Sequence, residues 1–213
     1  MLKLRELYYI THIENLLSIL KRGILCHRKI IEEQINFTPI YDEDIIALRK
    51  GKRVPDGREL WDFVNLYFQP RNPMLYRVLF HSNFKIDEVV VIGLKNSLLN
   101  RNDIILTDGN AASSNTQFFP VKDRDISKYI REKTDKEWWA IEDGSKREIM
   151  AECLVPEKVE PEYISEIYVA NQDAMNRVRD ICGERITVIP EPELFFLPSR
   201  QIPLTENLNL MEG

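Results

Sequence analysis

The stretch from Asp62 to Tyr76, DFVNLYFQPRNPMLY, constrains the fold of this chain most strongly. Pro70 and Pro73 fix their own φ angles and disfavour the α conformation at the residue before each of them. The backbone around Arg71 is therefore held extended, and its side chain offers a planar fork of donors that matches a phosphate or a carboxylate. Two interpretations stay open: Arg71 binds an anion, or it ends a strand and pairs with a local acid such as Asp62.

Apolar periodicity and turn residues predict strands and helices along the rest of the chain. A strand at Leu7–Thr11 leads into a helix that starts with capping-box spacing at Thr11 and Glu14 and stops at Gly23. Residues 25–61 are expected to be a long loop with at most one short helix, near Asp42 to Arg49. Further strands are expected at Val64–Phe68, Val89–Leu94, Ile104–Thr107, Arg147–Val155, Ile164–Val169 and Ile186–Ile189, and helices at Met74–His81, within 121–139 and at Asn171–Ile181.

The composition favours one cytoplasmic domain without a metal. A chain of 213 residues that is 44% hydrophobic can bury a core, so we expect a single domain over residues 1–200 and a flexible tail or linker over 201–213. No apolar run is long enough to span a membrane, and the N-terminus does not resemble a signal peptide. The three cysteines and three histidines lack metal-ligand spacing, which indicates buried thiols and no metal site.

The net charge of −5 hides an asymmetry between the two parts of the chain. Residues 1–85 carry 14 lysines and arginines against 10 acids, whereas residues 86–213 carry 15 against 24. The densest basic cluster of residues 1–85 comprises Arg49, Lys50, Lys52, Arg53 and Arg58. An anionic partner is therefore expected to bind the N-terminal part of the chain. The alternative is that this basic cluster is only a solvated loop.

Two polar residues stand out against their apolar surroundings. His12 lies at a strand-to-helix junction, where helix N-terminal amides favour a phosphate or ribose hydroxyl; the alternative is a neighbour of the helix cap. Glu152 interrupts the apolar run REIMAECLV, and burying an unpaired carboxylate there would cost several kcal/mol. The alternative places Glu152 on a solvent-exposed face of the strand.

Several separated motifs together resemble the DarT family of DNA ADP-ribosyltransferases, toxins of bacterial toxin–antitoxin systems. The segments YYITHIENLLSILKRGIL, PRNPMLY, TDGNAAS and AECLV stand in the family's order, and the resemblance covers residues 7–197. The resemblance implies an α+β ADP-ribosyltransferase fold, in which two small mixed or antiparallel sheets form an NAD cleft with peripheral helices. It also implies transfer of ADP-ribose from NAD to a base in single-stranded DNA, and a macrodomain antitoxin, DarG, that removes the mark.

The resemblance assigns roles to residues of this chain. Glu152 would stabilise the oxocarbenium-like ribose through its 2′-hydroxyl. Arg71 would hold the NAD pyrophosphate or help to deprotonate the acceptor base, and His12 would bind a ribose hydroxyl or the nicotinamide amide. Weaker candidates for NAD binding are Thr11, Asn15 and Tyr67.

The acceptor is expected to bind along residues 108–147, where transferases of this fold read their substrates. A stacked duplex hides its bases, so single-stranded DNA is the expected form. The candidate contacts are Asn110, Ser113, Ser114 and Asn115 for base edges, Phe118, Phe119 or Trp138 for stacking, and Arg147 for a phosphate. We favour thymidine as the acceptor and a monomeric enzyme; guanosine, RNA, protein or water as acceptor, and a non-catalytic nucleotide-binding module, remain alternatives.

Overall fold

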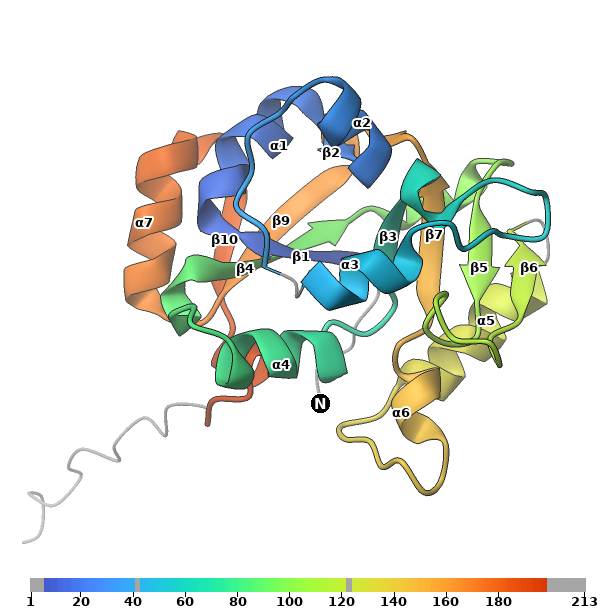
Figure 1. Cartoon of the computed structure of the whole chain (residues 1–213). Coiled ribbons are helices and arrows are strands. Elements are labelled where there is room, and N and C mark those ends of the chain that lie inside the picture. The colour runs from blue at the N-terminus through green and yellow to red at the C-terminus, as the bar shows by residue number, and fades with distance from the viewer. Residues whose placement is uncertain (1–5, 41–42, 122–123, 199–213) are drawn as a thin grey trace, which may run out of the picture.

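The computed structural model describes residues 6–40, 43–121 and 124–198. Within these residues, eight strands form one mixed sheet in the order β10-β9-β4-β1-β3-β7-β5-β6, and a second sheet pairs β2 with β8 (Figure 1). The strands are β1 Leu7–His12, β2 Ile24–Leu25, β3 Phe63–Tyr67, β4 Val89–Leu94, β5 Ile105–Thr107, β6 Phe118–Pro120, β7 Glu152–Pro156, β8 Lys158–Val159, β9 Ile164–Val169 and β10 Thr187–Pro190. The helices are α1 Leu16–Arg22, α2 His27–Glu32, α3 Glu43–Arg49, α4 Pro73–His81, α5 Arg124–Thr134, α6 Ser145–Glu148 and α7 Gln172–Cys182.

The large sheet consists of two halves that meet at β1 and β3. Strand β1 pairs with β4 along its whole length, but it pairs with β3 only where Tyr8 lies opposite Tyr67. In Figure 1 the β4, β9 and β10 half lies to the left of this junction and the β7, β5 and β6 half lies to the right. This junction of one residue pair divides the eight-stranded sheet into two smaller halves, each with mixed or antiparallel pairing.

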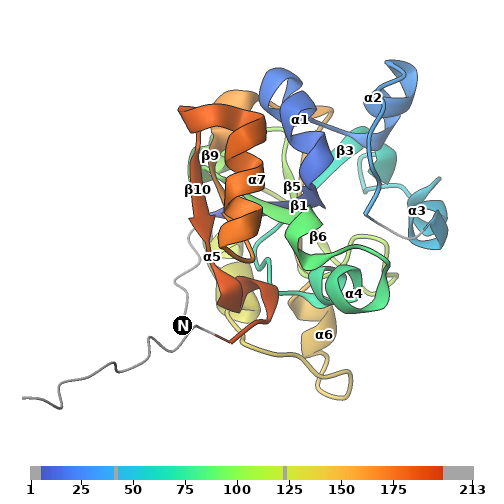
Figure 2. The ribbon, with the colours of Figure 1, turned by 90° about the vertical axis from the view of Figure 1, so that its left-hand side faces the viewer.

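Alternation along the central strands places apolar side chains on both faces of the sheet. Val90 and Ile92 of β4 belong to the larger core cluster, whereas Val89 and Val91 belong to a second cluster on the other face. Helices α1 and α7 contribute to the first cluster, and α4 contributes to the second. Figure 2 shows α1 and α7 together on one side of the sheet and α4 below them.

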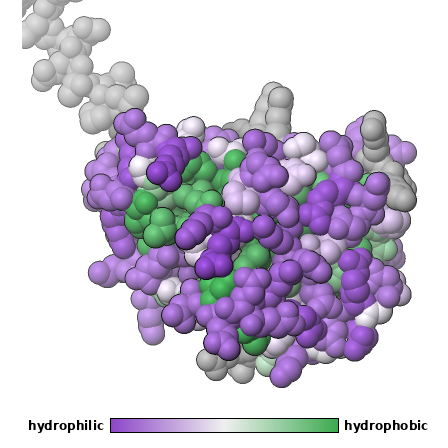
Figure 3. Space-filling model, turned by 90° about the horizontal axis from the view of Figure 1, so that it is seen from above, coloured by the Kyte–Doolittle hydropathy of each residue, from purple (hydrophilic) through white to green (hydrophobic). Residues whose placement is uncertain are grey.

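The surface above α1 and α2 is largely hydrophilic. Seen from above, it is covered mostly by polar residues, with separate apolar areas between them (Figure 3). Within the described part of the chain, no helix combines the length and the apolar character that crossing a membrane requires. The three cysteines are free and buried, as the sequence predicts.

Most of the expected elements are confirmed, and so is the end of the first helix at Gly23. Asn72 caps α4 by accepting a hydrogen bond from the Leu75 amide at 3.0 Å, and Gly23 ends α1 with a φ of 91°. The cap at the start of the first helical turn is His12 rather than Thr11, because the His12 ring nitrogen accepts from the Glu14 amide.

Two other expectations need correction. Residues 147–155 were expected to form one strand, but α6 ends at Glu148 and the strand begins at Glu152. Residues 25–61 contain the helix α2 in addition to α3. The expected tail over 201–213 lies outside the described residues.

Candidate active site

Glu152 is a buried carboxylate at the start of β7. The pairing of β3 with β7 places it opposite Tyr67, and its side chain is 0% exposed. The alternative that Glu152 faces solvent is therefore wrong. A buried carboxylate needs a charged partner and hydrogen-bond donors, because an uncompensated charge is strongly disfavoured in the interior.

The charged partner of Glu152 is Arg49, the last residue of α3. Arg49 Nη1 donates to Oε1 at 3.1 Å and Nη2 donates to Oε2 at 2.9 Å, which is the two-point geometry that a guanidinium forms with a carboxylate. The Arg49 side chain is only 11% exposed. Burial alone would lower the pKa of Arg49, but the charge of Glu152 and these hydrogen bonds raise it above its ordinary value.

The loop after β5 supplies the remaining contacts of Glu152. The Ala111 amide donates to Oε1 at 3.2 Å. The Thr107 hydroxyl accepts from the Glu152 amide at 2.9 Å and lies 2.7 Å from the Gly109 carbonyl, to which it donates. Among the described residues, Oε1 thus accepts two hydrogen bonds and Oε2 accepts one, while a carboxylate offers about four acceptor positions. One acceptor position on Oε2 therefore has no hydrogen-bond donor among the described residues.

Tyr67 lies beside the Arg49–Glu152 pair as a neutral phenol. Burial raises its pKa, and the charge of Glu152 raises it further. The Asn65 amide donates to the Tyr67 hydroxyl at 3.5 Å. The fold therefore brings Tyr67 next to the predicted catalytic glutamate.

The other predicted NAD-binding residues gather at the far end of β1. Asn15 donates to the Thr11 hydroxyl at 3.1 Å and to the Thr38 carbonyl at 2.8 Å. His12 is buried against Phe84, with ring centroids 5.4 Å apart. Because its Nδ1 accepts from a backbone amide, the proton of the neutral ring lies on Nε2, which can donate to a ligand. His12 is thus a cap residue that retains one donor.

This second group is separated from Glu152 along the strands. Tyr8 marks the point of β1 that lies opposite Tyr67, and His12 lies four residues further on, about 13 Å at the usual strand rise. Only an extended ligand such as a dinucleotide could contact both groups at once.

Arg71 is held away from the Glu152 carboxylate. Within the described residues, no hydrogen bond or ion pair joins Arg71 to Glu152 or to Asp62, which pairs with Arg28 instead. The Arg71 guanidinium lies 4.7 Å from the centre of the Phe196 ring, and its buried Nε has no hydrogen-bond partner. The interpretation that Arg71 pairs with a local acid such as Asp62 is therefore wrong.

The backbone around Arg71 is fixed as its prolines predict. Gln69 accepts from the Arg71 amide at 3.1 Å and donates to the carbonyls of Thr134 and Lys136, each at 3.3 Å. The segment is thereby anchored to the end of α5. Its arginine faces a group of aromatic rings, which comprises Tyr76, Phe80, Trp138, Trp139 and Phe196.

The predicted DNA-contacting residues fall into two places. Trp138 belongs to the aromatic group near Arg71, where it stacks on Trp139 at 4.6 Å and is 55% exposed. The others lie on the loop after β5 or next to it. There Asn110 accepts from the Ala112 amide, Ser113 accepts from the Asn115 amide and Ser114 is exposed. Phe119 packs against the larger core cluster, and Phe118 against a smaller one.

Arg147 does not present its guanidinium freely to a phosphate. Its Nη1 donates to the carboxylate of Asp108 at 2.8 Å and to the Asp108 carbonyl at 3.1 Å. Arg147 thus binds the base of the loop whose Ala111 amide contacts Glu152.

Within the described part of the chain, no cluster of three or more His, Cys, Asp or Glu side chains could hold a metal ion.

Sequence reasoning missed Arg49, Thr107 and Ala111 as members of the site. Arg49 was recognised only as part of a basic cluster, and 103 residues separate it from Glu152. Thr107 and Ala111 act through a hydroxyl and a backbone amide, which carry no residue-type signal. Phe196, the ring over which Arg71 lies, was also missed, because it is far from Arg71 in the sequence.

Comparisons with known proteins agree with this geometry. Residues 8–196 match the family model described as ssDNA thymidine ADP-ribosyltransferase, DarT. A DNA ADP-ribosyl transferase-DNA ADP-ribosyl glycohydrolase fusion protein of Thermosipho africanus is 50% identical over 212 residues, which cover 99% of this chain and 54% of that protein. A DNA ADP-ribosyl transferase of Thermus aquaticus is 28% identical over 188 residues, covering 84% of this chain and 81% of the relative.

Solved structures show the same fold. Thermosipho africanus DarTG in complex with ADP-ribose matches with a TM-score of 0.88 and 49% identity, over 95% of this chain and 54% of that one. Thermus sp. 2.9 DarT in complex with ADP-ribosylated ssDNA matches with a TM-score of 0.77 at 24% identity, over 91% and 97%. The chain spans about half the length of the Thermosipho relatives. Its α+β architecture is the ADP-ribosyltransferase fold, and the chain belongs to the DarT family.

Proposed function

We propose that this protein transfers ADP-ribose from NAD to a thymidine base in single-stranded DNA and releases nicotinamide. The observation that carries the proposal is the buried Glu152 carboxylate, held by Arg49 and the Ala111 amide with one acceptor position left on Oε2. Membership of the DarT family supports both the donor and the acceptor. We place the reaction in the cytoplasm, where NAD and DNA meet.

Glu152 acts on the donor ribose. The bond between nicotinamide and ribose C1′ breaks and nicotinamide leaves with the electron pair, so positive charge develops on the ribose. A fixed carboxylate that accepts from the 2′-hydroxyl stabilises this charge as it forms. Arg49 orients the carboxylate, because its two-point contact restricts rotation of the carboxylate plane. The acceptor nitrogen then bonds to C1′ and loses its proton to solvent.

The part of NAD that lies away from Glu152 extends toward the C-terminal end of β1, where His12 is located. The Nε2 donor of His12 suits a ribose hydroxyl, with Thr11 and Asn15 as its neighbours. Arg71 serves the pyrophosphate, because its guanidinium is held over Phe196 and its Nε lacks a protein partner. Tyr67 packs beside Glu152 at the reacting end.

The acceptor strand contacts the loop after β5 and the exposed Trp138. Asn110, Ser113, Ser114 and Asn115 lie on that loop, which borders Glu152 through Ala111. A macrodomain antitoxin of the DarG type reverses the modification, in line with the Thermosipho relative that joins a transferase to a glycohydrolase. We propose that residues 1–200 act as one monomeric transferase domain.

Incubation with labelled NAD and separate acceptors tests the proposed function. We expect label on thymidine-containing single-stranded oligonucleotides, located at the base by mass spectrometry, and none on oligonucleotides without thymidine. Glu152→Gln should abolish transfer, whereas the matched change Glu166→Gln, of a glutamate that bonds Tyr168 on β9, should not. Transfer only to guanosine, RNA or protein, NAD hydrolysis without transfer, or NAD binding without nicotinamide release would each replace the proposal with one of its alternatives.

A further inference from the structure

The loop of residues 108–117 is tied to three other parts of the protein. Its Ala111 amide donates to Glu152 Oε1, and its Ala112 carbonyl accepts from Lys52, three residues after Arg49. Its base is closed by the Gln117 amide, which donates to Asp108 Oδ1 at 2.8 Å. The loop therefore lies between the segment that carries Arg49 and the strand that carries Glu152.

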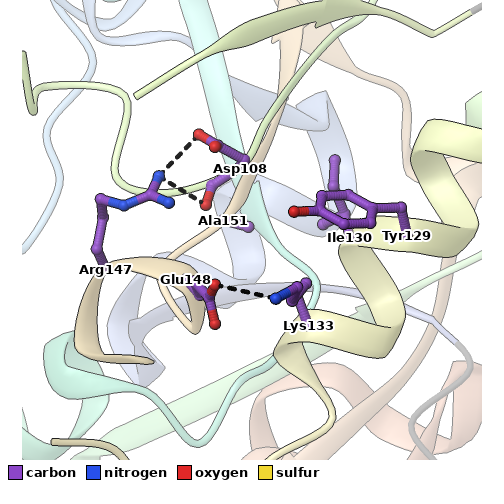
Figure 4. A pocket seen from close by; sticks show the side chains of 7 residues that line it. All are labelled: Asp108, Tyr129, Ile130, Lys133, Arg147, Glu148 and Ala151. Carbon is purple, nitrogen blue, oxygen red and sulfur yellow. Dashed lines mark hydrogen bonds and ion pairs between the residues drawn. The ribbon is translucent and has the colours of Figure 1, made fainter. Parts of the chain in front are cut away.

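The third tie is the ion pair between Asp108 and Arg147. Arg147 lies on α6, and its guanidinium points back to both the carboxylate and the carbonyl of Asp108 (Figure 4). Both side chains are at least two-thirds shielded from solvent, which reduces screening of the pair. The pair joins the base of the loop to the helix that directly precedes the Glu152 strand.

The backbone next to Asp108 is shaped to admit Arg147. A Cβ placed on Gly109 would lie 2.8 Å from both Cγ and Nη1 of Arg147, too close for either to remain in place. Any side chain at position 109 would therefore push the arginine away from Asp108. A substitution of Gly109 can therefore disturb the ion pair between Asp108 and Arg147 without changing either charge.

We propose that Asp108 and Arg147 are positioning residues for Glu152, and this inference rests on the proposed function. The ion pair fixes the base of the loop so that the Ala111 amide stays on Oε1. The carboxylate then keeps the orientation in which the free position of Oε2 faces the ribose. Small displacements of a reacting group can lower turnover by up to about a hundredfold. The main effect belongs to kcat, because the pair acts on the Glu152 carboxylate through the Ala111 amide.

The neighbouring charges favour this role over phosphate binding by Arg147. Nη1 of Arg147 is engaged twice by Asp108. The pocket beside it is also lined by Glu148, which pairs with Lys133 (Figure 4). Glu148 pairs with Lys136 as well. A phosphate bound in this pocket would lie close to the carboxylates of both Asp108 and Glu148.

Hydrogen exchange and kinetics of matched variants test the inference. Arg147→Ala and Gly109→Ala should speed amide exchange at Ala111 and across 108–117 and lower kcat by roughly ten- to a hundredfold, with KM for NAD unchanged within about twofold. Arg147→Lys, which keeps the charge, should recover part of kcat and of the protection. Asp87→Asn removes a comparable ion pair to Arg177, far from Glu152, and should change neither.

Each other outcome overturns the inference in a recognisable way. If Arg147→Ala raises KM for the oligonucleotide while exchange at 108–117 is unchanged, Arg147 is a phosphate contact. If exchange rises but kcat is unchanged, the pair is only structural. Should the wild-type protein show no turnover with any acceptor, the proposed function fails, and the exchange data still decide whether the pair holds the loop.

Discussion

Arg49 and Glu152 lie 103 residues apart in the sequence and form a buried ion pair with two hydrogen bonds, of 3.1 and 2.9 Å. Arg49 is the last residue of α3 and Glu152 is the first residue of β7. The pair therefore joins the helix that precedes β3 in the chain to the strand that pairs with β3. The only other hydrogen-bond donor to this carboxylate within the described residues is the Ala111 amide. Turnover and folding should therefore both depend on Arg49.

Arg49→Ala should lower the free energy of unfolding by about 3–5 kcal/mol, because it leaves Glu152 buried without its counter-charge. Urea denaturation measures this loss, and NAD turnover should be abolished at temperatures where the variant is still folded. Arg53→Ala is the control, since that arginine lies on the same segment but is exposed and pairs with Glu59. Wild-type stability and turnover in Arg49→Ala would show that the ion pair supports neither.

Local signals in the sequence located the elements, while the site depends on contacts between distant residues. Gly23 was recognised as the end of the first helix because a helix stop depends on neighbours three or four residues away. The strand holding Glu152 was recognised from its apolar run, but its start was placed five residues early because the buried residues 149–151, which link α6 to β7, belong to the same apolar run. Arg49 carried no local signal, since only the folded chain brings it to Glu152.

Arg71→Ala should fold normally and lose NAD turnover, mainly through a higher KM for NAD. The planar guanidinium stacks over Phe196, so Arg71→Lys should restore only part of the loss, because an ammonium neither stacks nor forms two parallel hydrogen bonds. Arg58→Ala is the control, since Arg58 lies over the Phe63 ring at 4.5 Å but is paired with Asp56. Normal turnover in Arg71→Ala would remove Arg71 from the NAD site.

Trp138→Ala should raise KM for the oligonucleotide about tenfold, the loss expected for one stacked base. Because Trp138 is half exposed and lies flat on Trp139, the variant should fold, and Trp138→Phe should keep most of the affinity. Ile141→Ala changes an exposed apolar residue of the same loop that has no aromatic face, so it should bind normally. Equal affinity of Trp138→Ala and wild type would place the DNA elsewhere.

Glu148 should make folding stability depend on pH in the acid range. The hydrogen bond from Lys136 holds the pKa of the Glu148 carboxyl below its ordinary value of 4.5. The folded state therefore binds the proton less readily than the unfolded chain, and the stability that Glu148 contributes is complete above pH 4.5 and is lost as the pH falls through the folded pKa. Glu148→Gln removes this contribution at neutral pH.

Unfolding free energies of wild type and Glu148→Gln, measured by urea denaturation from pH 7 to pH 3, should thus differ by a constant amount at neutral pH and converge in acid. Glu132→Gln is the control, because that glutamate is largely exposed and its pair with Lys128 is screened by solvent. A difference between Glu148→Gln and wild type that persists unchanged to pH 3 would mean that Glu148 stabilises α6 by packing, since a contribution from its charge must vanish once the carboxyl is protonated in both states.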